Sequence, residues 1–456
     1  MDTSAPNLDR NVRLFVLFRL FFNARFYYPI FTLLFLDFGL SITDFFILNG
    51  VVWTLSSILL EVPSGALADQ LGRRTLIVTA AVLMVIEMLV ICATPVGGAW
   101  ALVFTMFLIN RIFSGAAEAA ASGADEALAY DSIPEAERDT RWPKVQSQLM
   151  TVQAIGMIVA LNLGAGIYGF NDLATWFGLD WTLSRELTIK IPLFLCLATS
   201  IITLIISLMM KEPPKHSAHA GSTIGGSFRR TLSAGRWILS HRAPFFILLT
   251  FVLFDSIVRL FYTVSPSYYR VIELKPAFFG LIGTFGNVIG LLVAALIGWV
   301  IANRSASFNY RFGAIFVLSG LIGLAYQFPV WGFLVLLPLG IGMRHIHAAT
   351  STYLNRVTDS EHRATVLSFR GLAMMLFYGF VNVAAIAQVS VMRNLGIIKT
   401  SAADIAENPT RGDEIIQHAS PYWWMWFVWV LIGLTIFRVI VLRKPIDKII
   451  EEKKPA

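Results

Sequence analysis

Charged side chains are scarce in this chain, and that scarcity excludes an ordinary soluble protein. Asp, Glu, Lys and Arg make up 14% of its 456 residues, whereas soluble globular domains carry about 25%. Hydrophobic residues reach 56%, and the mean hydropathy is +0.68. A chain of this composition is expected to place much of its surface in lipid rather than in water.

Cysteine and the common catalytic motifs are also rare or missing. The two cysteines, Cys92 and Cys196, lie inside apolar runs and have no spacing suited to a disulfide framework or a metal site. The sequence has no glycine-rich phosphate loop followed by Lys and Ser or Thr, and no paired-histidine metal motif. We therefore expect no enzyme, no ATP-driven motor, and no metal or other cofactor.

Long apolar runs dominate what is present. A helix needs about 20 mostly apolar residues to cross a bilayer, and these runs lack the strict alternation of membrane strands. Twelve candidate runs lie at 12–36, 43–67, 74–95, 100–130, 145–169, 188–210, 243–268, 276–302, 309–328, 331–354, 364–390 and 421–442. The sequence predicts an all-α integral membrane protein with twelve transmembrane helices.

Basic residues indicate how these helices are oriented. With the N-terminus inside, the connections that face the cytoplasm carry most of the Lys and Arg, which is the positive-inside pattern. We expect both termini in the cytoplasm and a multi-pass monomer in a bacterial inner membrane. The net charge of +7 then indicates contacts with membrane lipids rather than with nucleic acid.

The longest connection predicted to face the cytoplasm divides the chain. Residues 211–242 hold Pro213, Pro214 and several basic residues, with six apolar runs on either side. We predict an N-terminal six-helix bundle at 1–210, a linker at 211–242, and a C-terminal six-helix bundle with a cytoplasmic tail at 243–456.

The connection between the second and third runs carries a specific motif. It reads Gly65-x-x-x-Asp69-x-x-Gly72-Arg73-Arg74. The motif resembles the loop motif of the major facilitator superfamily, except that Gln70 replaces the usual basic residue, and Arg111-x-x-x-Gly115 is similar to that family's second motif. The fifth run lacks the Gly-Pro pair typical of the family's drug/proton antiporters. The resemblance implies two bundles related by pseudo-two-fold symmetry, with alternating access around a site near the midplane.

The resemblance also implies that this loop is a cytoplasmic gate. The predicted gate comprises Gly65, Asp69, Gly72, Arg73, Arg74 and Asp131. The glycines permit a sharp turn, and Asp69 can accept hydrogen bonds at the start of a helix. Arg73 can pair with a carboxylate on a neighbouring helix, for which the resemblance points to Asp131. A simpler interpretation is that these charges only fix the orientation of the loop.

Ionisable residues inside the apolar runs form the candidate substrate and ion cavity. Such groups cost about 2.5–3.5 kcal/mol each on insertion scales, so they normally face a partner or water. In the fourth run, one helical stripe contains Arg111, Gly115, Glu118, Ser122 and Asp125. The predicted cavity residues are Arg19, Asn23, Tyr27, Arg111, Glu118, Asp125, Glu126, Asp255, Arg259, Tyr262, Arg344 and His347.

Several intramembrane charges also have simpler interpretations. Asp255 and Arg259 are spaced i, i+4, so they can form a structural pair that neutralises itself. His347 can titrate near neutral pH, but histidines also hydrogen-bond between packed helices. Arg25 can extend towards a lipid headgroup, and Glu87 can pair laterally with another helix.

Three functions are compatible with the sequence. The first is a proton-coupled exporter of small organic compounds, in which acids such as Glu118 and Asp125 trade a proton for substrate. The second is an importer or exporter of an organic anion or metabolite, because arginine binds carboxylates and phosphates through two parallel hydrogen bonds. The third is a non-transporting membrane sensor or partner protein. We expect secondary active transport of a small organic solute, coupled to protons or another ion, with export favoured over import.

Overall fold

The computed structural model describes most of the chain and is helical throughout the part that it describes. The described residues are 9–213, 233, 235–358, 360–443 and 447–448. Side chains at 62, 65, 66, 69, 360–365 and 367–368 also lie outside the description. Within the described ranges, every regular element is an α-, 3-10 or π-helix, which confirms the predicted all-α fold.

Twelve stretches of the described residues are long and apolar enough to cross a membrane, from Asp9–Asp37 to Pro409–Leu442. They follow the twelve apolar runs of the sequence, so the predicted number of spans is confirmed. In lipid, each backbone N–H and C=O must find its partner within the segment, and a helix provides that partner for apolar runs of this length.

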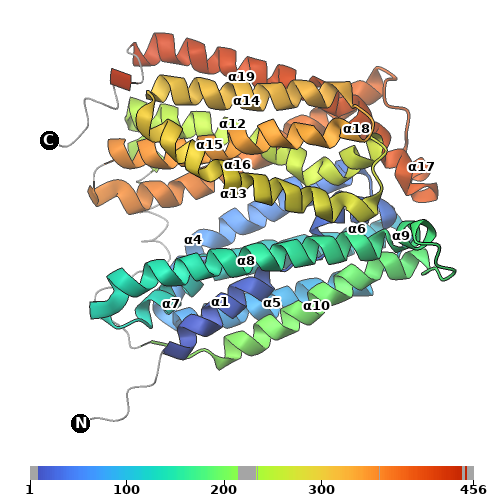
Figure 1. The fold of residues 1–456 in the computed structure, drawn as a ribbon, viewed down its shortest axis with the longest axis horizontal. Coiled ribbons are helices and arrows are strands. Elements are labelled where there is room, and N and C mark those ends of the chain that lie inside the picture. The colour runs from blue at the N-terminus through green and yellow to red at the C-terminus, as the bar shows by residue number, and fades with distance from the viewer. Residues whose placement is uncertain (1–8, 214–232, 234, 359, 444–446, 449–456) are drawn as a thin grey trace. The chain divides into compact units, whose positions relative to one another are not determined.

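The first of two compact units comprises Met1–Ile30 and Val52–Phe228. Its helices are α1 (Asp9–Asn23), η1 (Tyr28–Ile30), α4 (Trp53–Leu71), α5 (Arg73–Ala93), α6 (Trp100–Ala121), α7 (Ala124–Asp131), η3 (Glu135–Glu137), α8 (Arg138–Tyr168), α9 (Phe170–Trp176) and α10 (Arg185–Met209). In Figure 1, α1, α5, α8 and α10 run lengthwise beside one another. Apolar side chains such as Phe18, Ile77 and Met84 form a core shared by α1 and α5.

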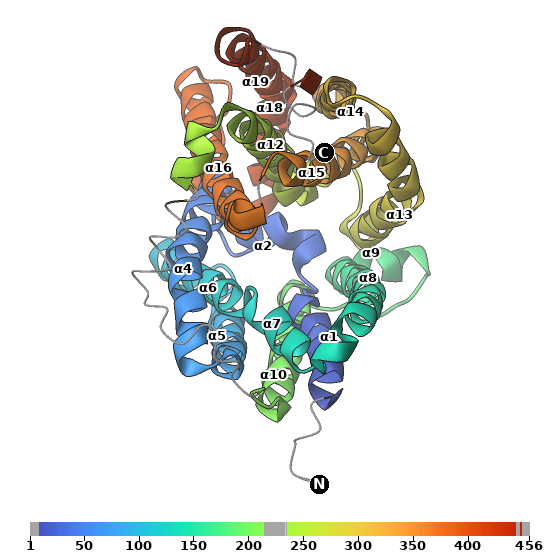
Figure 2. The same cartoon turned by 90° about the vertical axis from the view of Figure 1, so that its left-hand side faces the viewer.

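The second unit comprises Phe31–Val51 and Arg229–Ala456. Its helices are α2 (Phe31–Asp37), α3 (Ile42–Phe45), η2 (Phe46–Val52), α12 (Arg242–Val271), η5 (Pro276–Phe278), α13 (Phe279–Asn303), α14 (Ala306–Tyr326), η6 (Trp331–Val335), α15 (Leu336–Val357), α16 (Ser360–Asn394), α17 (Ala402–Glu407), η7 (Pro409–Gly412), α18 (Asp413–Ala419), η8 (Ser420–Tyr422), α19 (Trp423–Phe437) and η9 (Arg438–Leu442). Most residues of α12 are buried, and this helix packs against α15, α16 and α19 (Figure 2).

The segment Phe31–Val51 belongs to the second unit although it lies near the N-terminus. The hydroxyl of Thr32 donates a 2.6 Å hydrogen bond to the carbonyl oxygen of Thr263 on α12. The amide of Asn49 donates to the hydroxyl of Tyr378 on α16 at 3.3 Å. These contacts explain why the segment groups with the second unit.

The helix is irregular near both ends of the segment Phe31–Val51. Residues 24–27, before this segment, leave the helical conformation between α1 and η1. The π-helix η2 covers the other end, and its Gly50 packs directly against the side chain of Asn382. π-Helical segments are rare and frequently occur at functional sites.

The fourth apolar run is two helices rather than one. α6 ends at Ala121, Gly123 has a φ of 73°, and α7 begins at Ala124. A left-handed residue interrupts an α-helix and favours glycine, which has no Cβ to clash with the backbone. The predicted stripe from Arg111 to Asp125 is therefore interrupted before its last member.

Candidate functional site

The loop between α4 and α5 gathers charged groups within the first unit. Gly72 has a φ of 95°, which turns the chain sharply between the two helices. The guanidinium of Arg73 contacts the carboxylate of Asp131 and donates to the carbonyl oxygen of Ala127 at 2.8 Å. Nη2 of Arg138 lies 3.7 Å from Oδ1 of Asp131. The two charged residues that the resemblance paired are thus in contact.

Glu212 completes this loop, and it is not among the residues that the sequence predicts. Its Oε1 accepts a hydrogen bond from the backbone N–H of Arg73 at 2.9 Å, and its Oε2 accepts from that of Arg74 at 2.7 Å. A carboxylate in this position satisfies amides that have no partner at the start of α5 and meets the positive end of the helix dipole. Arg74 in turn donates to the carbonyl oxygens of Leu208 and Met210 at the end of α10.

These contacts tie the start of α5 to the ends of α7 and α10. We call this group the α5 junction and define it as Arg73, Arg74, Asp131 and Glu212. Two further residues of the predicted gate, Gly65 and Asp69, lie outside the residues whose side chains the structure describes.

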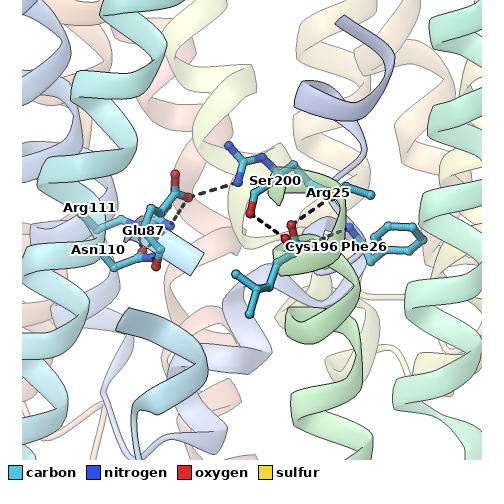
Figure 3. Close-up of polar contacts among 9 residues, drawn as sticks. Arg25, Phe26, Glu87, Asn110, Arg111, Cys196 and Ser200 are labelled. Carbon is cyan, nitrogen blue, oxygen red and sulfur yellow. Dashed lines mark hydrogen bonds and ion pairs between the residues drawn. The ribbon is translucent and has the colours of Figure 1, made fainter. Parts of the chain in front are cut away.

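A second ionic group is buried inside the first unit (Figure 3). Oε1 of Glu87 lies 3.2 Å from Nη1 of Arg25 and 3.7 Å from Nη2 of Arg111. Asn110 donates to the backbone carbonyl of Glu87 at 2.8 Å, and its Oδ1 accepts from Nε of Arg111 at 2.8 Å. All four side chains are buried. One carboxylate therefore holds two arginines from different segments, and we call these four residues the Glu87 cluster.

The irregular backbone at 24–27 places Arg25 in this cluster. The N–H of Phe26, which is outside the α-helix, donates to the sulfur of Cys196 at 3.1 Å (Figure 3). Gly164 of α8 lies so close to the carbonyl of Phe26 that any Cβ would overlap it. The alternative interpretation in which Arg25 extends to a lipid headgroup does not hold, because its guanidinium is buried against Glu87.

A third ionic pair joins α1 to α7. Nη2 of Arg19 donates to Oδ1 of Asp125 at 2.8 Å, and the backbone N–H of Glu126 donates to the same oxygen at 2.7 Å. Asp125 is completely buried, whereas Arg19 keeps 17% of its side chain exposed. Asn23 donates to the carbonyl oxygen of Arg19 at 3.0 Å. Tyr27, four residues later in the sequence, is buried.

The remaining members of the predicted stripe contact other helices. Gly115 packs against α4, where its missing side chain leaves room for Ser56. The hydroxyl of Ser122 donates to Oε1 of Glu61, also on α4, at 3.2 Å. Glu118 is half-buried. The stripe marks polar positions of α6 and α7, but these positions have several different neighbours.

In the second unit, the predicted pair Asp255 and Arg259 acquires a third member. Nε of Arg259 donates to Oδ2 of Asp255 at 2.9 Å, and Nη2 donates to Oδ1 at 3.1 Å. Nε2 of His347, on α15, lies 2.7 Å from the same Oδ1. The Asp255 side chain is 0% exposed, while Arg259 is 32% and His347 38% exposed. We call these three residues the Asp255 site.

Side chains from α12 and α16 surround the Asp255 site. The ring of Phe251 packs edge-on against the ring of His347, with centroids 4.8 Å apart. The guanidinium of Arg259 lies 5.9 Å from the ring centroid of Tyr378 and donates to the sulfur of Met374 at 3.0 Å. The sequence gives no signal for these α16 residues, because an uncharged side chain in an apolar helix cannot be distinguished from one that simply faces lipid.

Arg344 and Tyr262 are the last predicted members of the set. Arg344 is exposed and donates to the carbonyl of Gly286 at 3.3 Å. Its guanidinium and the hydroxyl of Tyr262 both lie beside Gly340, which has no side chain to exclude them. His345, the next residue in α15, is fully buried, and the centroid of its ring lies 4.7 Å from that of the Phe312 ring on α14.

These ionic groups can exchange one partner for another: an acid can take up a proton, and an arginine can bind an anion. Among the described residues, no group of three or more His, Cys, Asp or Glu is arranged to hold a metal ion. A buried ion pair is stable only while both partners remain, since removing one leaves an uncompensated charge. Protonation of the acid, or arrival of an anion at the arginine, therefore changes the state of both partners.

Twelve membrane-spanning helices with paired charges in their interior define a membrane transport protein rather than an enzyme. The chain belongs to the Major Facilitator Superfamily, whose family model matches residues 14–381. No curated protein matches the chain.

Solved structures with this fold include transporters of several kinds. The nucleoside transporter NupG has a TM-score of 0.68 and 11% identity, with 95% of this chain and 99% of that chain covered. An inward-facing, unoccupied bacterial homologue of the human lysosomal transporter Spinster has a TM-score of 0.68 and 14% identity, with 99% of each chain covered. A D-xylose–proton symporter has a TM-score of 0.62 and 15% identity, with 91% and 97% covered. At these identities the likeness shows the fold alone.

Proposed function

We propose that this protein is a secondary active transporter that moves a small organic anion together with a proton across the bacterial inner membrane by alternating access. The observation that carries the proposal is the Asp255 site, where a fully buried carboxylate is held by two partly exposed, potentially cationic partners. Family membership supports transport, and the site supports both the substrate class and the coupling.

The accessible part of the Asp255 site is basic. A solute that reaches it meets the guanidinium of Arg259 and the imidazole of His347 before it can meet Asp255. A guanidinium binds a carboxylate or phosphate through two parallel hydrogen bonds. The exposed Arg344 lies three residues before His347 on α15 and adds a further cation to that helix. A small organic anion fits this charge pattern better than a cation does.

Protonation of Asp255 couples the proton to the anion in this proposal. While ionised, Asp255 holds both hydrogen bonds from Arg259. A proton on the carboxyl weakens that hold and leaves the guanidinium available to the anion. When the anion leaves, Arg259 returns to Asp255 and the proton is released on the same side. Proton and anion therefore cross together, and an inward proton gradient drives uptake.

The α5 junction is the proposed gate on the side predicted to face the cytoplasm. Its contacts hold the start of α5 to the ends of α7 and α10. Because Glu212 binds the backbone N–H groups of both Arg73 and Arg74, its release would free the start of α5. We propose that these contacts form in one transport state and break in the other.

A proton-coupled exporter of small organic compounds is the second candidate, and the Arg19–Asp125 pair favours it. Asp125 is buried and Arg19 is 17% exposed, so this acid can also exchange its arginine for a proton. In an exporter of this kind, proton and substrate compete for the protein rather than bind together. The two candidates therefore predict opposite effects of pH on substrate binding.

The test is a thermal-shift screen of the purified protein in detergent, at one acidic and one alkaline pH, against organic anions, organic cations and neutral amphiphiles. A ligand of the folded state raises the apparent melting temperature. The proposal expects stabilisation by particular anions, stronger at acidic pH and lost in Arg259→Gln. The matched control is Arg304→Gln, which removes an exposed arginine at the end of α13.

Other outcomes of the screen would contradict the proposal. Stabilisation by cations or neutral amphiphiles, stronger at alkaline pH and altered by Asp125→Asn, would support the exporter. No stabilisation by any member of a broad library, together with no flux in proteoliposomes, would favour a non-transporting sensor or partner protein.

A further inference from the structure

A cavity of about 430 Å³ lies in the second unit, between one end of α12, α14 and α19. Sites for small molecules commonly enclose about 300–1,000 Å³. The lining residues that matter here are Phe246, Phe254, Arg311, Ala314, Leu434 and Arg438. The described residues that line this cavity are distinct from the three members of the Asp255 site, so the cavity needs a separate explanation.

Charge is confined to one end of this cavity. Arg311 lies in the second turn of α14, and Arg438 directly follows α19; both are exposed. Farther along the same helices the lining is uncharged and mainly apolar, with Ala314 on α14 and Leu434 on α19. The hydroxyls of Thr250 and Thr435, which also line the cavity, already donate to carbonyl oxygens of their own helices. On α12, Phe254 lies about 18 Å along the axis from the helix start, at 1.5 Å per residue. The cavity thus has a basic mouth and an apolar interior.

One acid, Asp447, also lines the mouth, and its carboxylate already accepts a backbone hydrogen bond. Oδ1 of Asp447 accepts a 2.8 Å hydrogen bond from the backbone N–H of Ser307 at the start of α14. Nε of Arg311 donates to the carbonyl of Ser307 at 3.1 Å. The mouth therefore carries two arginines, Arg311 and Arg438, against one carboxylate, and its balance of charge favours an anion.

The helices around the cavity have apolar outer faces that suit lipid contact. Ile315 on α14 is 65% exposed and Ile436 on α19 is 52% exposed. The starts of α12 and α14 and the end of α19 all lie on the side that the sequence predicts to be cytoplasmic. That leaflet carries the anionic lipids to which basic residues at a membrane surface are attracted.

We propose that this cavity binds an anionic phospholipid of the surrounding bilayer. Its headgroup phosphate would lie at Arg311 and Arg438, and an acyl chain would lie between Phe254 and Leu434. Inorganic phosphate could use only the arginines. A zwitterionic phospholipid such as phosphatidylcholine would bring a choline cation close to the two arginines, beside its phosphate. An anionic phospholipid uses the arginines and the apolar walls without that repulsion, and this binding is independent of the transported substrate.

The test uses the purified, delipidated full-length protein in detergent, with native mass spectrometry for binding and thermal shift for stabilisation. The probes are phosphatidylglycerol, phosphatidylcholine with identical acyl chains, and inorganic phosphate. One variant, Arg311→Gln/Arg438→Gln, removes the charge at the mouth, and another, Ala314→Phe, fills the interior while keeping both arginines. Arg304→Gln is the control, because Arg304 is an exposed arginine in the connection just before α14 and is not in the lining.

The proposal expects phosphatidylglycerol to bind more tightly than phosphatidylcholine and to raise the melting temperature more than either other probe. Both cavity variants should weaken that binding about tenfold, since each removes one half of an amphiphile's contacts; Arg304→Gln should leave it unchanged. Equal binding of phosphatidylcholine, equal stabilisation by phosphate, or an equal loss in Arg304→Gln would overturn it. If one cavity variant does not fold, as judged by gel filtration, the other decides between these outcomes.

Discussion

Nε2 of His347 lies 2.7 Å from Oδ1 of Asp255, although the two residues are 92 positions apart and on different helices. This contact turns a local pair of α12 into a link between α12 and α15. The carboxylate of Asp255 is therefore held by partners from both helices, Arg259 on α12 and His347 on α15.

Replacing Asp255 by Asn should separate transport from its driving force. The amide keeps the size of the side chain but cannot gain or lose a proton, so proton-driven uptake should fall by about 10²-fold, the lower end of what a positioned proton-transfer group contributes. Exchange of substrate without a gradient should persist. Both rates are measured in proteoliposomes with an anion identified by thermal shift. Asp180→Asn, at an exposed loop position, is the control, and an equal loss there would refute the assignment.

Removing the acid of the Glu87 cluster should destabilise the first unit strongly. Glu87→Gln leaves Arg25 and Arg111 buried without the carboxylate that they share. Breaking a buried pair in this way costs about 3–5 kcal/mol. Glu186→Gln is the control, because its i, i+4 pair with Lys190 is at an exposed position and should be worth at most about 0.5 kcal/mol. Thermal melts in detergent compare the two, and similar melting temperatures would contradict the role of the cluster.

Loss of Glu212 should loosen the start of α5. Glu212→Ala removes the acceptor of the backbone N–H groups of Arg73 and Arg74, with an expected cost of about 1 kcal/mol, as for other helix caps. Hydrogen exchange should accelerate in the first turn of α5 and remain unchanged in the middle of that helix. Glu135→Ala, at an exposed position in η3, should leave the exchange of α5 as it is. Unchanged exchange in Glu212→Ala would exclude the capping role.

Two glycines of α8 should differ in their tolerance of alanine. A Cβ at Gly164 would overlap the backbone carbonyl of Phe26, whereas one at Gly166 would meet only Leu173 at 3.9 Å, an ordinary contact. Gly164→Ala should therefore cost about 1–3 kcal/mol, the range for overpacking, and Gly166→Ala should be neutral or slightly stabilising because alanine favours helix. Melting temperatures of the two variants test this difference. Equal melting temperatures would show that residues 24–27 can shift away from α8 to make room for the added Cβ.

The apolar runs predicted the number of spans because a bilayer imposes length and composition on each helix separately. The pair Asp255 and Arg259 could also be predicted, since an i, i+4 spacing is local. The contacts of Arg25 with Glu87 and of Arg73 with Glu212, in contrast, could not be predicted from the sequence. Glu87 lies 62 residues from Arg25, and Glu212 lies 139 residues from Arg73, so no local spacing connects them.

The break between α6 and α7 shows why even a local pattern can mislead. Small residues surround Gly123 in the sequence, and a helix in a membrane can contain glycine without ending. Its left-handed φ of 73° is a conformation that glycine permits but that the sequence does not require. A stripe drawn on an ideal, uninterrupted helix cannot include such a break, so the sequence predicts the polar positions but not their neighbours.

The grouping of Phe31–Val51 with the second unit has a consequence for biosynthesis. Thr32 bonds a residue made 231 positions later, and Asn49 bonds one made 329 positions later. When a ribosome has completed the first six spans, this segment has entered the membrane but its partners on α12 and α16 do not yet exist. Such long-range pairing is slow to form and exposes unfinished surface in the meantime. The N-terminal half must therefore wait in the membrane, incompletely packed, until the C-terminal half arrives.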